Sequence, residues 1–359
     1  AIENLREYGE KLARSIRKRH EGKVELRPLS YVTIDGKPAI DVVFQTTGMM
    51  RVWQRLLWVQ AEPSYHPNQK YYHGLKYGPK GSGGLTERNL RVLKKIINQP
   101  YGLVLVVGPT GSGKTTSLHA CLGHINKPGV KIWTAEDPVE ITQIGLRQVE
   151  AKPKIGLDFA RIMRAFLRAD PDVIMIGEMR DQETASIGVE ASLTGHMVFS
   201  TLHTNSAPET VTRLLDMGLN PLNFSDAFLG VMAQRLARRL CKNCREAYHP
   251  SREEFDEIVN DFGEEHWEKT GIEYSSDLTL YKPVGCEQCS STGYRGRLGI
   301  HELMEGTKEI KGLIKRAEET ETLFATAIKQ GMNTLKQDGI LKSFQGLTDI
   351  SEIRRICIA

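Results

Sequence analysis

Several features are scarce or missing in this 359-residue sequence, and each absence excludes a class of protein. No apolar run approaches the roughly 18 residues that cross a bilayer, and the first residues lack the apolar centre of a signal peptide. Six cysteines are too few for a disulfide framework in a chain this long. A net charge of +4 is too small to require a nucleic-acid partner. We therefore expect a cytoplasmic protein of several domains that does not insert into a membrane itself.

The order of apolar runs and turn residues predicts four regions. Residues 1–84 begin with a basic helical stretch, followed by short strand-like runs (KVEL, IDVVF) and a glycine-rich linker, so we expect a small α+β domain there. In residues 85–235 the runs LVLVV, VKIWTA, DVIMI and HMVFSTL alternate with amphipathic segments, which predicts a mostly parallel sheet covered by helices. Residues 236–299 form a cysteine-containing insert, and residues 300–359 form a polar helical region.

A phosphate-binding loop follows the first predicted strand of this sheet. Residues 108–115 match the pattern G-x-x-x-x-G-K-[ST], in which backbone N–H groups converge on phosphate oxygens. Lys114 would neutralise the phosphates and Thr115 would bind Mg²⁺, at the positive end of a helix dipole. The alternative is a glycine-rich turn without a ligand. The predicted nucleotide-binding residues are Gly108, Pro109, Thr110, Gly111, Ser112, Gly113, Lys114, Thr115 and Thr116.

Two acidic residues at strand ends are candidates to activate water. Glu178 follows the strand DVIMI, where Gly177 replaces the usual aspartate, so it would reach a metal only through water. Glu136 ends the strand VKIWT, before Pro138. Either glutamate could be the catalytic base, and ordinary strand-end roles are the alternatives.

Histidines and arginines supply further candidates. His196 and His203 lie before and after one predicted strand, and His203 is at the edge where ligands of open α/β sheets bind. Arg164 and Arg168 share one face of the amphipathic segment LDFARIMRAFLRADPD and could reach nucleotide or a neighbouring subunit. Packing roles for the histidines and a solvated surface for the arginines are the alternatives.

Four cysteines form two C-x-x-C pairs with metal-ligand spacing. Cys241 and Cys244 form one pair, and Cys286 and Cys289 form the other after a longer segment with a predicted helix, SREEFDEIVNDF. Two such pairs supply the four thiolates of a closed tetrahedral zinc site, so we expect structural Zn²⁺.

Together these motifs identify a family. GPTGSGKTT, AEDPVE, GLDFARIMRAFLRADPDVIMIGEMRD, GHMVFSTLHTN and the cysteine pairs resemble, in this order, the secretion-superfamily ATPases of type II secretion and type IV pilus assembly, the GspE and PilB group. The resemblance covers roughly residues 85–302. It implies a RecA-like P-loop NTPase core and a PAS-like N-terminal domain. It also implies a homohexamer in which each subunit binds ATP between these two domains.

The resemblance also assigns residues and partners. It places Lys114 in the Walker A motif, Glu136 in the acidic box, Glu178 in an atypical Walker B motif, and the two histidines in a histidine box. In the first domain, Arg51 and Arg55 match nucleotide-contacting arginines, although the family segment IDLR reads IDVV here. The implied function is a Mg²⁺-dependent motor ATPase that drives pilus or pseudopilus assembly through an inner-membrane platform protein, at which it would lie peripherally.

Two other functions stay open at this point. A ring ATPase that moves nucleic acid would use the arginines of QRLARRLCKNCR, although aromatic residues for stacking are missing there. A scaffold that binds ATP without hydrolysing it would follow if the changes in the first domain had abolished turnover.

Overall fold

The computed structural model describes residues 24–26, 30–34, 37–46, 53–59 and 84–357. The chain divides into two compact units, one over Ala1–Lys70 and one over Tyr71–Ala359. Among the described residues, no helix combines the length and the apolar character needed to cross a bilayer.

The first unit contains an antiparallel sheet of four strands. These are β1 (Val24–Leu26), β2 (Ser30–Ile34), β3 (Lys37–Thr46) and β4 (Trp53–Val59), and the long β3 pairs with each of the other three. The predicted strands in KVEL and IDVVF are confirmed as β1 and part of β3. The predicted basic helix lies outside the described residues, and the PAS-like character of this unit stays a prediction.

The second unit is built on a sheet of seven strands in the order β13-β10-β5-β9-β8-β6-β7. All neighbours are parallel except the edge pair β10 and β13. The strands are β5 (Gly102–Val107), β6 (Ile132–Glu136), β7 (Leu146–Glu150), β8 (Val173–Ile176), β9 (Met197–Leu202), β10 (Phe228–Leu240) and β13 (Tyr294–Glu305). The four predicted strands are confirmed as β5, β6, β8 and β9, whereas the prediction missed the other three.

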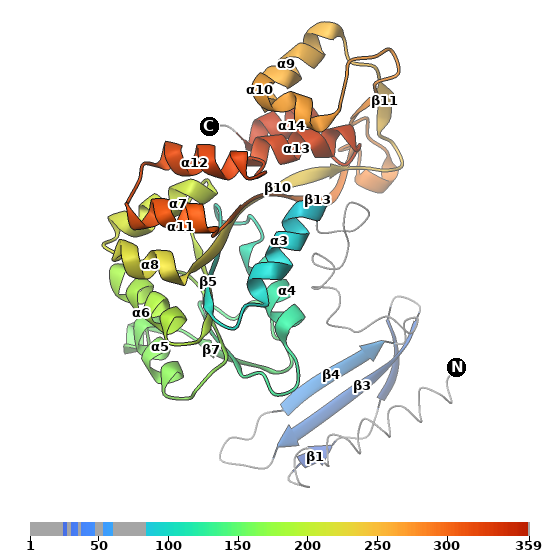
Figure 1. Cartoon of the computed structure of the whole chain (residues 1–359). Coiled ribbons are helices and arrows are strands. Elements are labelled where there is room, and N and C mark those ends of the chain that lie inside the picture. Colours follow the sequence, from blue (N-terminus) through green and yellow to red (C-terminus); the bar gives the residue numbers. More distant parts are fainter. Residues whose placement is uncertain (1–23, 27–29, 35–36, 47–52, 60–83, 358–359) are drawn as a thin grey trace. The chain divides into compact units, whose positions relative to one another are not determined.

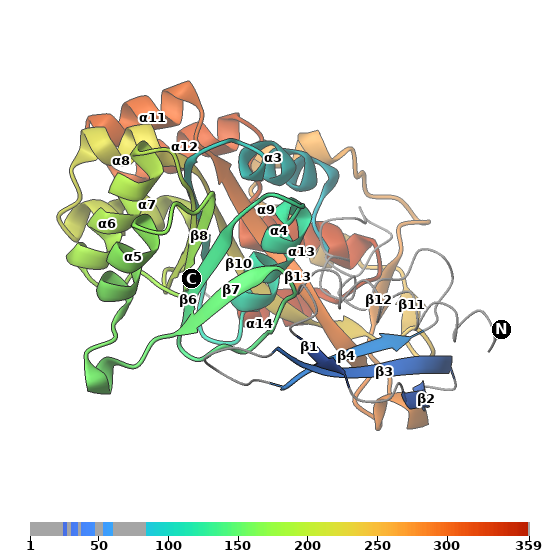
Figure 2. The same cartoon turned by 90° about the horizontal axis from the view of Figure 1, so that it is seen from below.

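Helices cover both faces of this sheet (Figures 1 and 2). One layer contains α3 (Glu87–Ile97) and α4 (Lys114–Ile125). The other contains α5 (Phe159–Leu167), α6 (Gln182–Leu193), α7 (Ala207–Asp216) and α8 (Pro221–Ala227), with the single 3-10 turn η1 (Pro153–Ile155) between β7 and α5.

The alternating direction of side chains along the buried strands explains why helices pack on both faces of the sheet. In β5, Val104 and Val106 pack in the cluster of α3 and α4, whereas Leu103, Leu105 and Val107 pack in the other cluster. Successive side chains of a strand point to opposite faces, so a continuous apolar run buries both. At roughly 1.5–3 kcal/mol for each large apolar side chain, this burial holds the sheet that carries the site.

The rest of the second unit leaves the sheet and returns to it. A two-stranded sheet joins β11 (Glu246–Tyr248) to β12 (Leu280–Lys282), and α9 (Arg252–Phe262), α10 (Glu264–Trp267), η2 (Glu268–Thr270) and η3 (Glu287–Cys289) complete this segment. The chain ends in α11 (Lys308–Lys315), α12 (Thr320–Lys329), α13 (Leu335–Phe344) and α14 (Ile350–Ile356). The predicted insert helix is confirmed as α9. Trp267 packs edge-on against Phe255 and Phe262 and contacts Phe344 of α13.

The predicted region limits at residues 235 and 299 fall inside strands. The first lies within β10 and the second within β13, and these two strands pair along most of their length. The cysteine-containing segment is therefore a long excursion between two strands of the main sheet.

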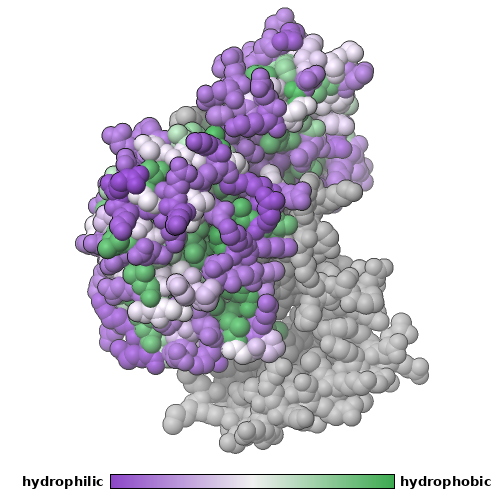
Figure 3. All heavy atoms as spheres, in the orientation of Figure 1, coloured by the Kyte–Doolittle hydropathy of each residue, from purple (hydrophilic) through white to green (hydrophobic). Residues whose placement is uncertain are grey.

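Figure 3 shows one face of the molecule, on which hydrophilic residues predominate and apolar side chains form small separate patches. Among the described residues, Ile155 is the most exposed large apolar side chain, at 74%.

Candidate active site

The phosphate loop has the strand-loop-helix structure that the sequence predicts. It connects β5 to α4, and Gly108, Gly111 and Gly113 all have positive φ, at 144°, 78° and 88°. A Cβ on Gly108 would lie 2.4 Å from the backbone oxygen of Gln234. Glycine at this position is therefore required by both conformation and space.

Lys114 begins α4 and turns back over the loop. Its Nζ donates hydrogen bonds to the carbonyl oxygens of Gly108, at 2.8 Å, and of Pro109, at 3.1 Å. Burial lowers the pKa of Lys114 below its usual value. The ammonium group is thus held where the loop's N–H groups and the helix dipole already favour an anion.

A pocket of about 430 Å³ opens beside this loop. It lies where β5, β6, β8 and β9 end, the edge at which open α/β sheets bind ligands. Groups of both charge signs line it, and apart from the loop they are Glu136, Asp137, Glu140, Glu178, Arg180, His203 and Arg297. The predicted loop residues from Thr110 to Thr116 line it as well.

Glu136, the last residue of β6, is buried and held by three neighbours. Its Oε1 accepts hydrogen bonds from Thr134 Oγ1 at 2.6 Å and Gln148 Nε2 at 2.9 Å, and its Oε2 lies 3.2 Å from His119 Nε2. Burial raises the pKa of Glu136, but the hydrogen bonds from His119, Gln148 and Thr134 outweigh that effect and lower it overall. The structure therefore presents an ionised carboxylate in a fixed position.

Glu178 lies two residues beyond β8 and lines the same pocket. Its side chain is 11% exposed, and it contacts Arg180 through Oε1 and His203 Nε2 through Oε2, the latter at 3.1 Å. His203 is half exposed, and its pKa is lowered first by partial burial and then by the charges of Lys114 and Arg180. The lowered pKa favours the neutral form of His203, which can donate a hydrogen bond from Nε2 to the Glu178 carboxylate.

Three predicted residues do not meet in this pocket. His196 lies before β9 and its Nδ1 is 2.9 Å from the carbonyl oxygen of Ala191, so the six-residue strand, about 20 Å long, separates it from His203. Arg164 is exposed and pairs with Glu183 of α6, and Arg168 is the C-cap of α5. None of the three lines the pocket in this chain. Their assignment to nucleotide binding or catalysis is not supported by the geometry within one subunit.

Two further predicted residues belong to the first unit. Arg51 lies outside the described residues, and Arg55 is placed in β4, opposite Val43 of β3. Their assignment as nucleotide-contacting residues stays a prediction.

Several residues that line the pocket or contact its lining lie outside the predicted set. Arg180 follows Glu178 by two positions, so a search for cations near the acidic strand end would have found it. Gln234 and Arg297 lie on β10 and β13, more than a hundred residues from the loop, and no local pattern marks them. His119 lies within α4, and only its buried contacts reveal a role.

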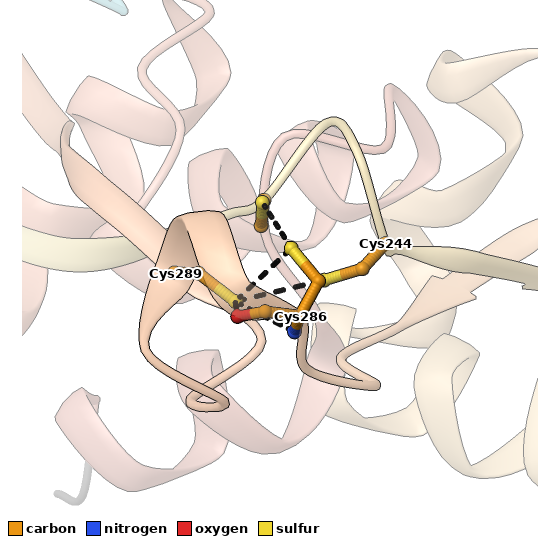
Figure 4. Close-up of side chains that lie close together, drawn as sticks. Cys244, Cys286 and Cys289 are labelled. Atoms are coloured by element: carbon orange, nitrogen blue, oxygen red, sulfur yellow. Dashed lines mark hydrogen bonds between the residues drawn. The ribbon is translucent and has the colours of Figure 1, made fainter.

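The four predicted cysteines converge in the segment between β10 and β13. Their Sγ atoms all lie within 4.8 Å of one another, and the separations are 3.9 Å for Cys241 and Cys286, 3.7 Å for Cys244 and Cys289, and 3.7 Å for Cys286 and Cys289. Figure 4 shows the labelled side chains pointing toward one another. Four thiolates about 2.3 Å from a central ion would be about 3.8 Å apart at the corners of a tetrahedron. The cluster could therefore hold a metal ion.

Backbone donors support the thiolate form of one cysteine in this cluster. Burial raises the pKa of Cys289, but hydrogen bonds from the N–H groups of Cys286 and Gly293 lower it to about 6. A thiolate is the form that ligates metals.

The glycine loop between β5 and α4, at the carboxyl edge of a mostly parallel sheet with acidic residues beside it, defines a P-loop protein of the RecA-like class. The chain belongs, more particularly, to the family described as type II/IV secretion system protein, whose profile matches residues 81–355. This confirms the family that the motifs predict.

Two curated relatives bear on this assignment. Type II secretion system protein E of Dickeya dadantii is 45% identical over 273 residues, which cover 76% of this chain and 52% of that protein. The type IV pilus assembly ATPase PilB of Pseudomonas aeruginosa is 44% identical over 273 residues, which cover 76% of this chain and 46% of that protein. The chain thus spans about half the length of the curated relatives it matches.

Solved structures agree on the fold. The pilus retraction motor PilT with bound ADP has a TM-score of 0.54 at 24% identity, over 96% of this chain and 82% of that one. The ATPase DotB of Legionella pneumophila has a TM-score of 0.54 at 19% identity, over 93% of this chain and 77% of that one.

Proposed function

We propose that this chain is a Mg²⁺-dependent ATPase. The observation that carries the proposal is the single pocket in which the phosphate loop meets two buried carboxylates, Glu136 and Glu178. The loop's N–H groups and Lys114 would bind the phosphates, and the Thr115 hydroxyl would hold Mg²⁺. When bound, Mg²⁺ neutralises charge on the phosphate oxygens.

Hydrolysis needs a group that orients water and accepts its proton. The water oxygen forms a bond to the γ-phosphorus, the bond from that phosphorus to the bridging oxygen of ADP breaks, and the water's proton passes to a carboxylate. Glu136 and Glu178 both face the space where this water would lie. Arg180 and Arg297 supply positive charge at the same pocket.

We further propose that six copies form a ring motor for pilus or pseudopilus assembly. The names of the relatives, a type II secretion protein and a pilus assembly ATPase, support this function. Hydrolysis would change the angle between the two units of each subunit and drive a separate inner-membrane platform protein, at which the cytoplasmic ring would lie. In this ring Arg164, which is exposed, is free to act on a neighbouring subunit's nucleotide after leaving Glu183.

The cysteine cluster is proposed as a structural zinc site. All four coordination positions would be filled by Cys241, Cys244, Cys286 and Cys289, which leaves none for substrate. The sulfur separations of 3.7–3.9 Å support this ion, since they match a tetrahedron with Zn–S bonds of about 2.3 Å.

Movement of nucleic acid is the weaker alternative, because three of the four arginines in QRLARRLCKNCR make contacts within the chain. Arg238 pairs with Glu352 and stacks over Tyr294, with its guanidinium carbon 4.0 Å from the ring centre. Arg245 donates to the carbonyl oxygen of Gly346. Arginines held in this way are not available to phosphates of a strand.

Phosphate release by the assembled protein tests the proposal. Wild type should hydrolyse ATP, Lys114→Ala should lose ATP binding, and Glu178→Gln should bind ATP but turn over about 10²–10⁴ times more slowly. Glu190→Gln, the same change at an exposed position of α6 outside the pocket, is the matched control and should keep the wild-type rate.

The outcomes separate the candidate functions. ATP binding without turnover in wild-type rings supplied with the platform protein would contradict the ATPase proposal and favour a scaffold. Turnover that depends on single-stranded DNA, with a steep salt dependence, would favour movement of nucleic acid.

A further inference from the structure

A histidine that is not among the predicted site residues lies behind Glu136. His119 is on α4, five residues after Lys114, and its side chain is 0% exposed. Its Nε2 lies 3.2 Å from Glu136 Oε2, and its Nδ1 lies 3.1 Å from Gln143 Oε1. The ring therefore connects the helix of the phosphate loop to the acidic wall of the pocket.

Hydrogen bonding fixes one proton of this ring. Gln143 Nε2 donates to the backbone oxygen of His119 at 3.1 Å, so the amide oxygen Oε1 is the atom that faces Nδ1. An amide oxygen only accepts hydrogen bonds. Nδ1 of His119 consequently carries a hydrogen and donates it to Gln143.

The other side of Glu136 is fixed in the same way. Gln148 Oε1 accepts from the N–H of Gln143 at 2.8 Å, so Gln148 Nε2 is the donor to Glu136 Oε1. Thr134 Oγ1 donates to the same oxygen at 2.6 Å. With two donors already on Oε1, any proton of this carboxyl group must be on Oε2, which faces His119.

A single proton must therefore lie between Glu136 Oε2 and His119 Nε2. Without it, the lone pairs of two buried acceptors would face each other, at a cost of several kcal/mol. The two donors on Oε1 favour the ionised form of the carboxyl group, which places the proton on His119. Because the ring has no exposed surface, this proton does not exchange directly with solvent.

We propose that His119 is a positioning residue of the active site that shares one buried proton with Glu136 and so keeps this carboxylate ionised and fixed in the pocket wall. The test of this proposal by ATP turnover rests on the proposed ATPase function. The hydrogen-bond geometry within this chain carries the inference itself.

Other charges also face Glu136 and enter its pH dependence. Lys114 comes from the start of α4, Glu178 from the end of β8, and Asp137 from the same strand end. Glu150 of β7 is its neighbour in the strand register. His119 is the group among them that hydrogen-bonds the carboxylate, so its substitution should have the largest effect on the charge of Glu136.

The test replaces the imidazole with a neutral side chain that still donates. His119→Gln can keep a hydrogen bond to Glu136 Oε2 but cannot carry the positive charge. The pKa of Glu136 should rise, so the acidic side of the pH profile of kcat should move to higher pH. We expect this acidic limb to move by about one pH unit, with the ratio of variant to wild-type turnover closer to one at pH 8.

His266→Gln is the matched control, because it makes the same change in α10, outside the pocket lining. It should keep the wild-type pH profile. A His119→Gln profile parallel to wild type, lowered equally at every pH, would indicate a merely structural role and overturn the inference.

A second readout does not depend on turnover. The infrared difference between each background and its Glu136→Gln derivative reports whether this carboxyl group is ionised. In the wild-type pair the ionised carboxylate should be present at pH 6 and should persist to lower pH than in the His119→Gln pair. A protonated Glu136 in wild type at pH 6 would overturn the inference, even if His119→Gln fails to fold. Wild type that lacks turnover but shows the expected spectra would contradict the proposed function alone.

Discussion

Gln234 of β10 should control nucleotide affinity, although it lies more than a hundred residues beyond the phosphate loop along the chain. Its Nε2 donates to the backbone oxygen of Ser112 at 2.7 Å, and its Oε1 accepts from Ser117 Oγ at 2.6 Å. Gln234 and Ser112 are both 3% exposed, so water does not replace these bonds when the side chain is removed. Gln234→Ala should therefore loosen the phosphate loop.

The size of this effect follows from the two lost hydrogen bonds. At roughly 1 kcal/mol each, they contribute about 2 kcal/mol to the ordered loop. If ATP binding must restore that order, the Kd for ATP should rise about 30-fold. The midpoint of thermal unfolding should fall by only a few degrees, because the strands and their apolar core are unchanged.

Isothermal titration with a slowly hydrolysed ATP analogue measures this change. Gln345→Ala removes the same side chain at an exposed helix C-cap and should leave the Kd unchanged. A Gln234→Ala variant that is folded and binds the analogue within twofold of wild type would refute the reasoning.

Three other predictions concern the cysteine cluster, a buried acid and an exposed arginine. Cys286→Ser should abolish stoichiometric zinc in elemental analysis yet leave the Kd for ATP within about threefold, because the cluster does not line the pocket; retention of zinc would contradict the site. Burial raises the pKa of Glu352, but hydrogen bonds from Arg355 and Arg238 lower it to about 2. A carboxyl group whose pKa is lower in the folded than in the unfolded chain stabilises the fold at pH values above its unfolded pKa, and this stabilisation is lost as pH falls toward its folded pKa. Glu352→Gln should therefore reduce the free energy of unfolding by about 2 kcal/mol at pH 7 and by progressively less from pH 5 to pH 2. Equal losses at pH 7 and pH 2 in urea titrations would argue against the assignment. Arg164→Ala should leave the Kd for ATP of the isolated chain unchanged, because Arg164 pairs with Glu183 away from the pocket; reduced turnover only in assembled rings would indicate action on a neighbouring subunit.

Local sequence was sufficient for the parts of this molecule that depend on neighbouring residues. The phosphate loop requires glycines with positive φ directly after a buried strand, and the eight residues 108–115 contain all of them. The strands β5, β6, β8 and β9 are continuous apolar runs, since parallel strands are buried on both faces. The paired cysteines likewise have the spacing that a single metal site needs.

The strands that the sequence reasoning missed have less regular patterns. β7 is an edge strand of partly exposed residues, and the buried half of β10 continues into a basic stretch that resembles a surface segment. Pairing with β13, which lies some sixty residues further along the chain, makes β10 a strand throughout.

The sequence by itself therefore determined the P-loop, the main parallel strands, the candidate glutamates and the cysteine ligands, because each is encoded by spacing along the chain. Only the tertiary structure decided which side chains share the pocket. It places Gln234 against the loop and His119 behind Glu136, while it leaves His196 at the far end of β9 and Arg164 on the surface. The physical reason is that hydrogen bonds and burial depend on which strands and helices lie side by side. Residues far apart in the chain become neighbours only when the sheet has formed, so local sequence patterns do not reveal these contacts.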